Sequence, residues 1–196
     1  MDAEAKVYAA LMTDAKQRIG LVRQLDEGSV TTTRTEFDIE LACLSLRRVL
    51  EVIAFSSLAA NKAAYARHHI DFGRHWKAEK ILTKLELINP EFYPVPVTGL
   101  GTGHIEPIDV PHLTRLDFSK LYDLTSEILH TWNPYKPEPR VVDLIRPVKE
   151  WAELVWMLLR EHMLKVAESD KRLIVQMHHP VDGQVHVFVA EPRTQA

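Results

Sequence analysis

Prolines are distributed unevenly along this chain, and their distribution constrains the fold more than any other feature of the sequence. The 196 residues include eleven prolines, of which none precedes Pro90 and nine lie between Pro90 and Pro147. Proline lacks a backbone N–H and disfavours a helical conformation in the residue before it, so it is rare inside helices. The first 89 residues can therefore form long helices, whereas residues 90–114 are expected to be an extended loop.

Periodic apolar residues predict five helices. Side chains such as Val7, Leu11 and Ile19 recur mostly at three- and four-residue spacing, which is typical of amphipathic helices. The pattern places helices at residues 2–26, 33–66, 74–89, 118–132 and 142–169. A continuous helix over 33–66 would be about 50 Å long, so we expect a kink or a break within it. Its apolar residues surround most of the helix, which makes it the predicted central helix of a bundle.

Two β-branched runs near the C-terminus predict a β-hairpin. Residues 172–179 and 184–190 flank Asp182 and Gly183, and an Asp-Gly pair between such runs is a strong signal for a hairpin turn. A two-residue turn would place His179 opposite His186. The predicted fold is therefore mainly α, a bundle of about five helices with a C-terminal β-hairpin. We expect a helical bundle domain over residues 1–170 and the hairpin with a tail over residues 171–196.

Composition excludes several classes of protein. A hydrophobic content of 46% and a formal net charge of −3 exclude a disordered chain and argue against a global nucleic-acid-binding surface. Cys43 is the single cysteine, so no intrachain disulfide forms, and its apolar neighbours predict an inert core position. The first residues do not resemble a secretory signal, and no stretch approaches the length of a membrane span. We expect a cytoplasmic protein with no membrane association.

The segment 67–77 concentrates basic, histidine and aromatic side chains next to Gly73. Arginine and histidine beside an aromatic ring can bind a phosphate or a nucleotide base, and histidine can act as a general acid or base. The candidate catalytic residues are Arg67, His69, Arg74 and His75, and the candidate phosphate- or nucleic-acid-binding residues are Arg67, Arg74, Trp76, Lys77 and Lys80. The alternative interpretation is a solvated helix end, where cations favour the C-terminal end of the helix dipole.

Metal and cofactor sites have weaker support in the sequence. His75 and Glu79 have a helical ligand spacing that His68 or His69 could complete, but no recognisable ligand set appears. His178, His179 and His186 form a second group, either a shared metal or proton site or a pH-sensitive surface patch. The glycines at 99, 101 and 103 neither follow a convincing strand nor open a helix, so they predict a loop rather than a phosphate-binding turn. We expect neither a metal nor a cofactor.

The predicted central helix carries a charged stripe. Glu40, Arg47 and Glu51 lie nearly in one line along it. This stripe is either a solvated face with an Arg47–Glu51 pair or a polar seam in a homodimer interface. The interface would comprise Glu40, Leu44, Arg47, Glu51, Phe55 and Leu58.

A family resemblance follows from the same helix. Arg47, Leu50 and Glu51 form an Arg-x-x-Leu-Glu core that resembles the HEPN-like superfamily over about residues 33–66. The resemblance implies a compact bundle of four or five helices that is commonly dimeric. Many HEPN proteins are metal-independent ribonucleases with an arginine followed, after four to six residues on a helix, by a histidine. The predicted helices lack this spacing; Arg172 and His178 show it, but in a predicted strand.

The leading functional prediction is a non-catalytic HEPN-like helical interaction module in a prokaryotic defence or toxin–antitoxin system. We expect it to be a homodimer that also binds a protein partner. The alternative is an RNA-directed nuclease or a nucleotide-binding enzyme that uses the cluster between Arg67 and His75.

Overall fold

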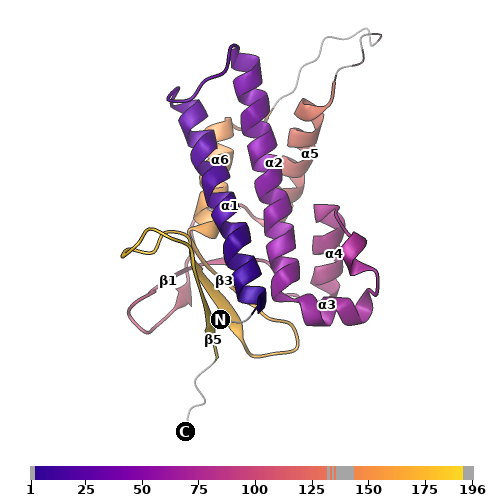
Figure 1. Ribbon diagram of the computed structural model, residues 1–196, viewed down its shortest axis with the longest axis vertical. Coiled ribbons are helices and arrows are strands. Elements are labelled where there is room, and N and C mark those ends of the chain that lie inside the picture. The colour runs from indigo at the N-terminus through magenta and orange to yellow at the C-terminus, as the bar shows by residue number, and fades with distance from the viewer. Residues whose placement is uncertain (1–2, 132, 134, 136–143, 192–196) are drawn as a thin grey trace.

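Helices make up most of the computed structural model, which describes residues 3–131, 133, 135 and 144–191. The long helices run side by side along the long axis of the molecule (Figure 1). Within the described residues the helices are α1 (Ala3–Asp26), α2 (Thr35–Ala60), α3 (Lys62–His68), α4 (Ala78–Ile88), α5 (Arg115–Leu129) and α6 (Val148–Leu159), with a short 3-10 helix η1 (Phe72–Arg74). The fold is thus mainly α, as predicted.

Helix α2 forms the centre of the helical layer. It contacts α1, α4, α5 and α6, and Leu46, Leu50 and Ile53 are almost fully buried. This burial agrees with the sequence, in which apolar residues surround most of the helix predicted over residues 33–66. The expected break occurs at Asn61, where α2 ends and α3 begins in a new direction (Figure 1).

Five strands form an antiparallel sheet beside the N-terminal half of α1. They are β1 (Val95–Thr98), β2 (Glu106–Pro107), β3 (Glu161–Lys165), β4 (Arg172–Gln176) and β5 (His186–Ala190). Their order in the sheet is β2-β1-β3-β4-β5. Alternate side chains of β3 are buried, namely His162 and Leu164, whereas β4 buries the three consecutive residues Leu173, Ile174 and Val175. Contacts of α1 with β5 and of α6 with β1 and β3 place the shared core between sheet and helices.

The sheet corrects three predictions. The fifth helix was predicted to continue to Ser169, but α6 ends at Leu159 and the chain enters the central strand β3. The extended segment 90–114 is not only a loop, because it contributes β1 and β2. The C-terminal strands are therefore two of five rather than a lone hairpin, and β3 pairs with β4 along five residue pairs. Strand pairing with distant residues overrides the local helical pattern of this segment.

The register of the predicted hairpin also differs. Gln176, and not His179, pairs with His186, so the connection spans residues 177–185 instead of a two-residue turn. Met177, the first residue of this connection, is fully buried and donates its N–H to the Arg160 carbonyl, directly before β3.

Some predictions fall outside the described residues. The end of the fourth helix at Trp132, most of the proline-rich connector 133–139 and the start of the fifth helix at Val142 lie there. Within the described part of the chain, no helix combines the length and the apolar character that crossing a membrane requires.

Candidate functional site

Four titratable side chains gather where α3 turns through η1 into α4. Tyr65 lies in α3, His69 directly follows that helix as its C-cap, His75 follows η1, and Lys84 lies on α4. The ring of Tyr65 lies 4.7 Å from that of His69 and 5.8 Å from that of His75, and the two imidazoles are 5.6 Å apart. We call Tyr65, His69, His75 and Lys84 the surface histidine cluster.

Hydrogen bonds orient His75 within this cluster. The Tyr65 hydroxyl lies 2.9 Å from His75 Nδ1, and Lys84 Nζ lies 3.1 Å from His75 Nε2. An ammonium group can only donate, so Nε2 is the acceptor and the remaining proton of a neutral ring sits on Nδ1, facing the Tyr65 oxygen. Asp71 Oδ1 lies 3.6 Å from Nε2. His75 is thereby held between a phenol, a cation and a carboxylate.

The surroundings favour a neutral His69. Desolvation, followed by the positive charge of Lys84 and the neighbouring histidines, lowers the pKa of His69. Desolvation also raises the pKa of Tyr65, so its phenol stays protonated at neutral pH. Both histidines are half-buried, which leaves part of each ring open to solvent. The cluster therefore presents a proton acceptor and a proton donor side by side.

The four predicted catalytic residues do not all lie together. His69 and His75 converge, whereas Arg67 leaves the cluster and forms an ion pair with Glu168. Arg74 is exposed on η1. The structure thus brings together two of the four predicted catalytic residues.

The predicted nucleic-acid-binding residues beyond Arg74 are also at the surface. Trp76 is 67% exposed, and the Lys77 ammonium lies over its ring at 5.3 Å from the centroid. Lys80 is exposed on the first turn of α4. An exposed indole among cations is typical of a surface that stacks nucleotide bases.

The predicted metal ligands of this region have other partners. Glu79 receives a bond of 2.9 Å from Arg115 of α5, and His68 Nδ1 lies 3.1 Å from the Ala64 carbonyl on its own helix. Glu79 is therefore engaged with α5, and His68 with its own helix, instead of with His75.

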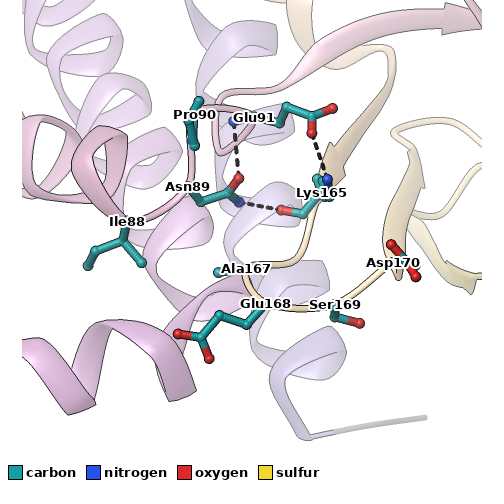
Figure 2. A pocket seen from close by; sticks show the side chains of 9 residues that line it. All are labelled: Ile88, Asn89, Pro90, Glu91, Lys165, Ala167, Glu168, Ser169 and Asp170. Carbon is teal, nitrogen blue, oxygen red and sulfur yellow. Dashed lines mark hydrogen bonds and ion pairs between the residues drawn. The ribbon is translucent and has the colours of Figure 1, made fainter.

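A polar pocket of about 390 Å³ lies near the end of α4 (Figure 2). It is lined by Ile88, Asn89, Pro90, Glu91, Lys165, Ala167, Glu168, Ser169 and Asp170. Buried Asn89 donates to the Lys165 carbonyl and to the side chain of buried Asn61, each at 2.9 Å. These bonds fix the pocket floor to the α2–α3 break.

None of the four cluster residues lines this pocket. Glu91 pairs with Lys165 at 2.8 Å, and this hydrogen bond lowers the pKa of Glu91. Glu168 is engaged by Arg67. Two of the pocket's carboxylates therefore already have cationic partners from the same chain, and the pocket offers less reactive chemistry than the cluster.

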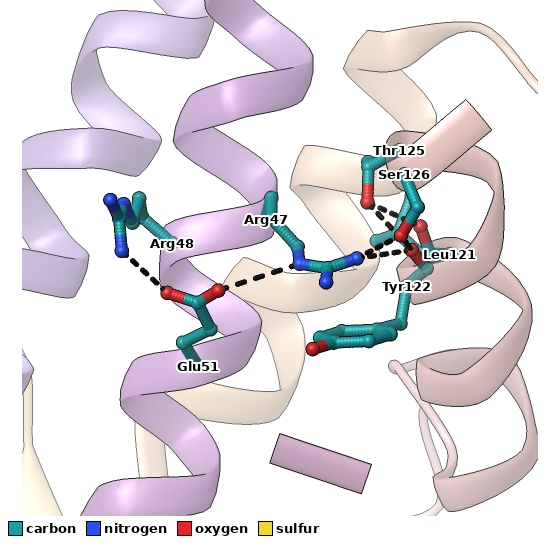
Figure 3. A network of polar contacts seen from close by, with 7 residues as sticks. All are labelled: Arg47, Arg48, Glu51, Leu121, Tyr122, Thr125 and Ser126. Carbon is teal, nitrogen blue, oxygen red and sulfur yellow. Dashed lines mark hydrogen bonds and ion pairs between the residues drawn. The ribbon is translucent and has the colours of Figure 1, made fainter. Parts of the chain in front are cut away.

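The charged stripe of α2 contacts α5 of the same chain (Figure 3). Arg47 donates to the Tyr122 carbonyl at 2.7 Å and to the Ser126 hydroxyl, and its guanidinium lies 3.2 Å from the centroid of the Tyr122 ring. Glu51 accepts from Arg47 and from Arg48, at 3.5 and 2.8 Å. The predicted Arg47–Glu51 pair is present, and it belongs to the α2–α5 packing.

The remaining predicted interface residues differ in exposure. Leu58 is buried, Phe55 is half-buried, and Leu44 and Glu40 are exposed on the first half of α2. Cys43 is buried as predicted, and its desolvation, with Glu40 nearby, raises the pKa of the thiol to about 11. This thiol is a poor nucleophile at neutral pH.

Sequence reasoning missed two members of the cluster. Tyr65 precedes His69 by four residues on one helix face, a spacing that puts the two side chains in contact. Lys84 lies on the polar side of the segment 74–89, and no local signal in the sequence connects it to His75 across the turn. The first omission was avoidable from the sequence, and the second was not.

Comparisons with known proteins give no relative for this geometry. A scan against protein-family models and searches of curated proteins and of solved structures find no match to the chain.

Proposed function

We propose that this protein binds single-stranded RNA beside α3 and α4 and cleaves it at the surface histidine cluster. The observation that supports this function is the convergence of His69 and His75, which offers two imidazoles for a reaction that needs an acid and a base. The exposed Trp76 and its neighbouring cations supply a binding surface next to them.

In the proposed reaction, His69 takes the proton of a ribose 2′-hydroxyl. The 2′-oxygen attacks the adjacent phosphorus, and the bond from phosphorus to the 5′-oxygen breaks. His75, protonated at Nε2, gives its proton to the leaving 5′-oxygen. The products are a 2′,3′-cyclic phosphate and a free 5′-hydroxyl, so atoms and charges balance without water or a redox partner.

Lys84 and Tyr65 prepare these steps. When Lys84 turns to a phosphate oxygen, it offsets the charge that develops there and frees His75 Nε2 to take up a proton. Tyr65 holds His75 through Nδ1 and keeps the ring oriented. Trp76 stacks on a base, while Arg74, Lys77 and Lys80 bind the backbone phosphates.

Cleavage of a fluorophore-labelled RNA in the presence of EDTA tests the proposal. Replacing His69 or His75 by alanine should lower the rate by about 10²–10⁴-fold, the usual contribution of one general acid or base. His68→Ala is the matched control, because His68 is exposed and bonds only the carbonyl of Ala64. Undiminished cleavage by the His69→Ala, His75→Ala double variant would contradict the proposed chemistry.

RNA binding is measured separately by fluorescence anisotropy. Trp76→Ala should weaken binding by about tenfold, since stacking on one base contributes roughly 1–3 kcal/mol. Ile70→Ala, at a 98% exposed apolar position in the same connection, should leave affinity unchanged. If both variants bind alike, Trp76 does not stack on RNA.

A second proposal retains the HEPN-like interaction module, with a homodimer or another protein as partner. It is favoured by Phe37 and Leu44, which lie seven residues apart on α2 and are 46% and 40% exposed. Light scattering on the wild type and on a Phe37→Glu, Leu44→Glu variant tests it. A dimer that becomes monomeric supports this proposal, and a wild-type monomer at micromolar concentration counts against the homodimer.

A further inference from the structure

The connection between β4 and β5 folds into a compact turn that brings three metal-binding side chains together. The imidazoles of His179 and His186 stack with centroids 4.1 Å apart and planes inclined by 13°. Asp182 reaches both rings, with 2.9 Å from its Oδ2 to His186 Nε2 and 3.8 Å from its Oδ1 to His179 Nδ1. One ligand atom from each residue lies within 4.8 Å of the other two.

Backbone bonds hold this turn in shape. His179 and Gln184 pair through N–H and carbonyl at 2.9 Å, and Gly183 donates to the His179 carbonyl at 2.7 Å. Gly183 has a φ of +67°, a conformation that glycine adopts without strain. The Lys16 ammonium on α1 donates to the Gly183 carbonyl, so the turn is fixed to the helical layer. The three side chains are thus positioned by the fold.

The structure changes the membership of the predicted histidine group. His178 points to α1, with its Nδ1 at 3.3 Å from Lys16 Nζ, and Asp182 takes the third place beside His179 and His186. The longer turn causes this change, because a two-residue turn would have put Asp182 at its tip, away from both rings. The Gln184 N–H donates to Asp182 Oδ1 at 2.8 Å, which fixes the orientation of the carboxylate.

We propose that His179, Asp182 and His186 bind one divalent transition-metal ion, for which Zn²⁺ is the expected occupant. Two imidazoles and a carboxylate are a ligand set that suits Zn²⁺ and its first-row neighbours, whereas Mg²⁺ and Ca²⁺ prefer oxygen ligands alone. A tetrahedral ion with bonds of about 2.0–2.2 Å separates its ligands by about 3.4 Å. The Asp182 contacts of 2.9 and 3.8 Å bracket that separation, whereas the stacked imidazoles must rotate out of their nearly parallel planes before a nitrogen of each faces the same ion.

Three protein ligands leave a fourth position to water. Asp182 is exposed and both histidines are only half-buried, so solvent reaches this position. An open coordination position is a property of zinc sites that act on a ligand, in contrast to closed structural sites. The site is separate from the surface histidine cluster, since in Figure 1 the connection before β5 and helix α3 lie on opposite sides of the helices. The inference is therefore independent of RNA cleavage.

Calorimetric titration of tag-free protein with Zn²⁺ alone tests the site. The wild type should bind one ion per chain. His179→Gln, His186→Gln and Asp182→Asn should each weaken binding at least tenfold, the loss expected for one ligand in a small set. Asn at 182 still accepts the Gln184 N–H, so this variant removes the ligand charge and keeps the turn. His104→Gln, an exposed histidine on another loop, should bind as the wild type does.

Co²⁺ provides a second readout, because its visible spectrum reports nitrogen and oxygen ligands directly. Equal Zn²⁺ affinity in the wild type and in the His179→Gln, His186→Gln double variant would overturn the proposal. So would a wild type that binds no stoichiometric Zn²⁺, in which case the three side chains form only a hydrogen-bonded turn. Circular dichroism of each variant shows whether β4 and β5 are retained, and Asp182→Asn carries the test if a histidine variant fails to fold.

Discussion

Two tyrosine–histidine pairs occupy opposite environments in this molecule. In the core, the Tyr8 hydroxyl donates to His162 Nε2 at 2.8 Å. At the surface, the Tyr65 hydroxyl meets His75 Nδ1 at 2.9 Å. The two contacts are nearly equal in length, but the tyrosine hydroxyl donates in the core and faces the Nδ1–H of His75 at the surface, so the pairs differ in direction and in what surrounds them.

The buried pair has no capacity for further chemistry. His162 is fully buried and uses its second nitrogen to donate to the Leu159 carbonyl at 2.8 Å. Burial lowers the pKa of His162 to about 4, so the ring is neutral across the physiological range. In the surface pair, by contrast, the second imidazole nitrogen, His75 Nε2, contacts the ammonium group of Lys84, which in the proposed reaction moves to a phosphate oxygen. A tyrosine–histidine bond is therefore structural or reactive according to its access to solvent and to a third group.

The largest expected difference between the pairs is in stability. His162→Ala should lower the free energy of unfolding by about 3–5 kcal/mol, because it opens a cavity and removes the buried hydrogen bonds to the Tyr8 hydroxyl and the Leu159 carbonyl. His75→Ala should lower it by less than about 1 kcal/mol, since water replaces the lost contacts. Urea unfolding followed by circular dichroism measures both. Equal losses in the two variants would show that the pairs do not differ as described.

A smaller effect is expected in the pH dependence of stability. With a folded pKa near 4 and an unfolded pKa of about 6.5, His162 binds its proton more readily in the unfolded chain. Stability is therefore complete above the unfolded pKa and falls as the pH drops from about 6.5 to 4, by about 3 kcal/mol.

His162→Gln isolates this contribution. Glutamine can accept from Tyr8 and donate to the Leu159 carbonyl, but it does not titrate. Unfolding free energies measured between pH 7 and pH 4.5 should fall less steeply in this variant than in the wild type. If the free energy of unfolding falls with pH equally in the variant and in the wild type, groups other than His162 cause the acid sensitivity.

The smallest effects distinguish the two hydroxyls. Tyr8→Phe should cost about 1–3 kcal/mol, because it leaves His162 Nε2 buried without a donor. Tyr65→Phe should cost less than about 1 kcal/mol and should instead lower RNA cleavage several-fold by loosening His75. Thermal melts and the cleavage assay, applied to both variants, separate a structural hydroxyl from a positioning one. A stability loss in Tyr65→Phe that matched that of Tyr8→Phe would remove the distinction.

The sequence predicts the helical layer well because its signals are local. The proline-free N-terminal half indicates α1, α2 and α4, and the excessive length of the segment 33–66 indicates the break that occurs at Asn61. Helix α5 begins at Arg115, three residues before the predicted start at residue 118, after an N-cap at Thr114 that accepts from the Asp117 N–H.

The sheet could not be predicted in the same way. The residues of β3 follow Leu159 without glycine or proline, so the apolar spacing of α6 continues through them. What selects a strand is pairing with β4 on one side and β1 on the other, and β1 lies more than sixty positions earlier. The candidate sites could not be predicted fully for the same reason. Lys84 and Asp182 meet their partners only because of turns whose length cannot be predicted from the sequence.

The Tyr8–His162 bond also has a consequence for how the protein is made. Its two residues are 154 positions apart, so at about 5–20 residues per second the ribosome needs roughly 8–30 s to produce the second after the first. Helices α1 and α2 can pair early, but the side of α1 that contacts α6 and β5 stays uncovered until those elements emerge. A nascent chain of this protein therefore presents an apolar surface for many seconds, and such transiently exposed surface is prone to aggregation.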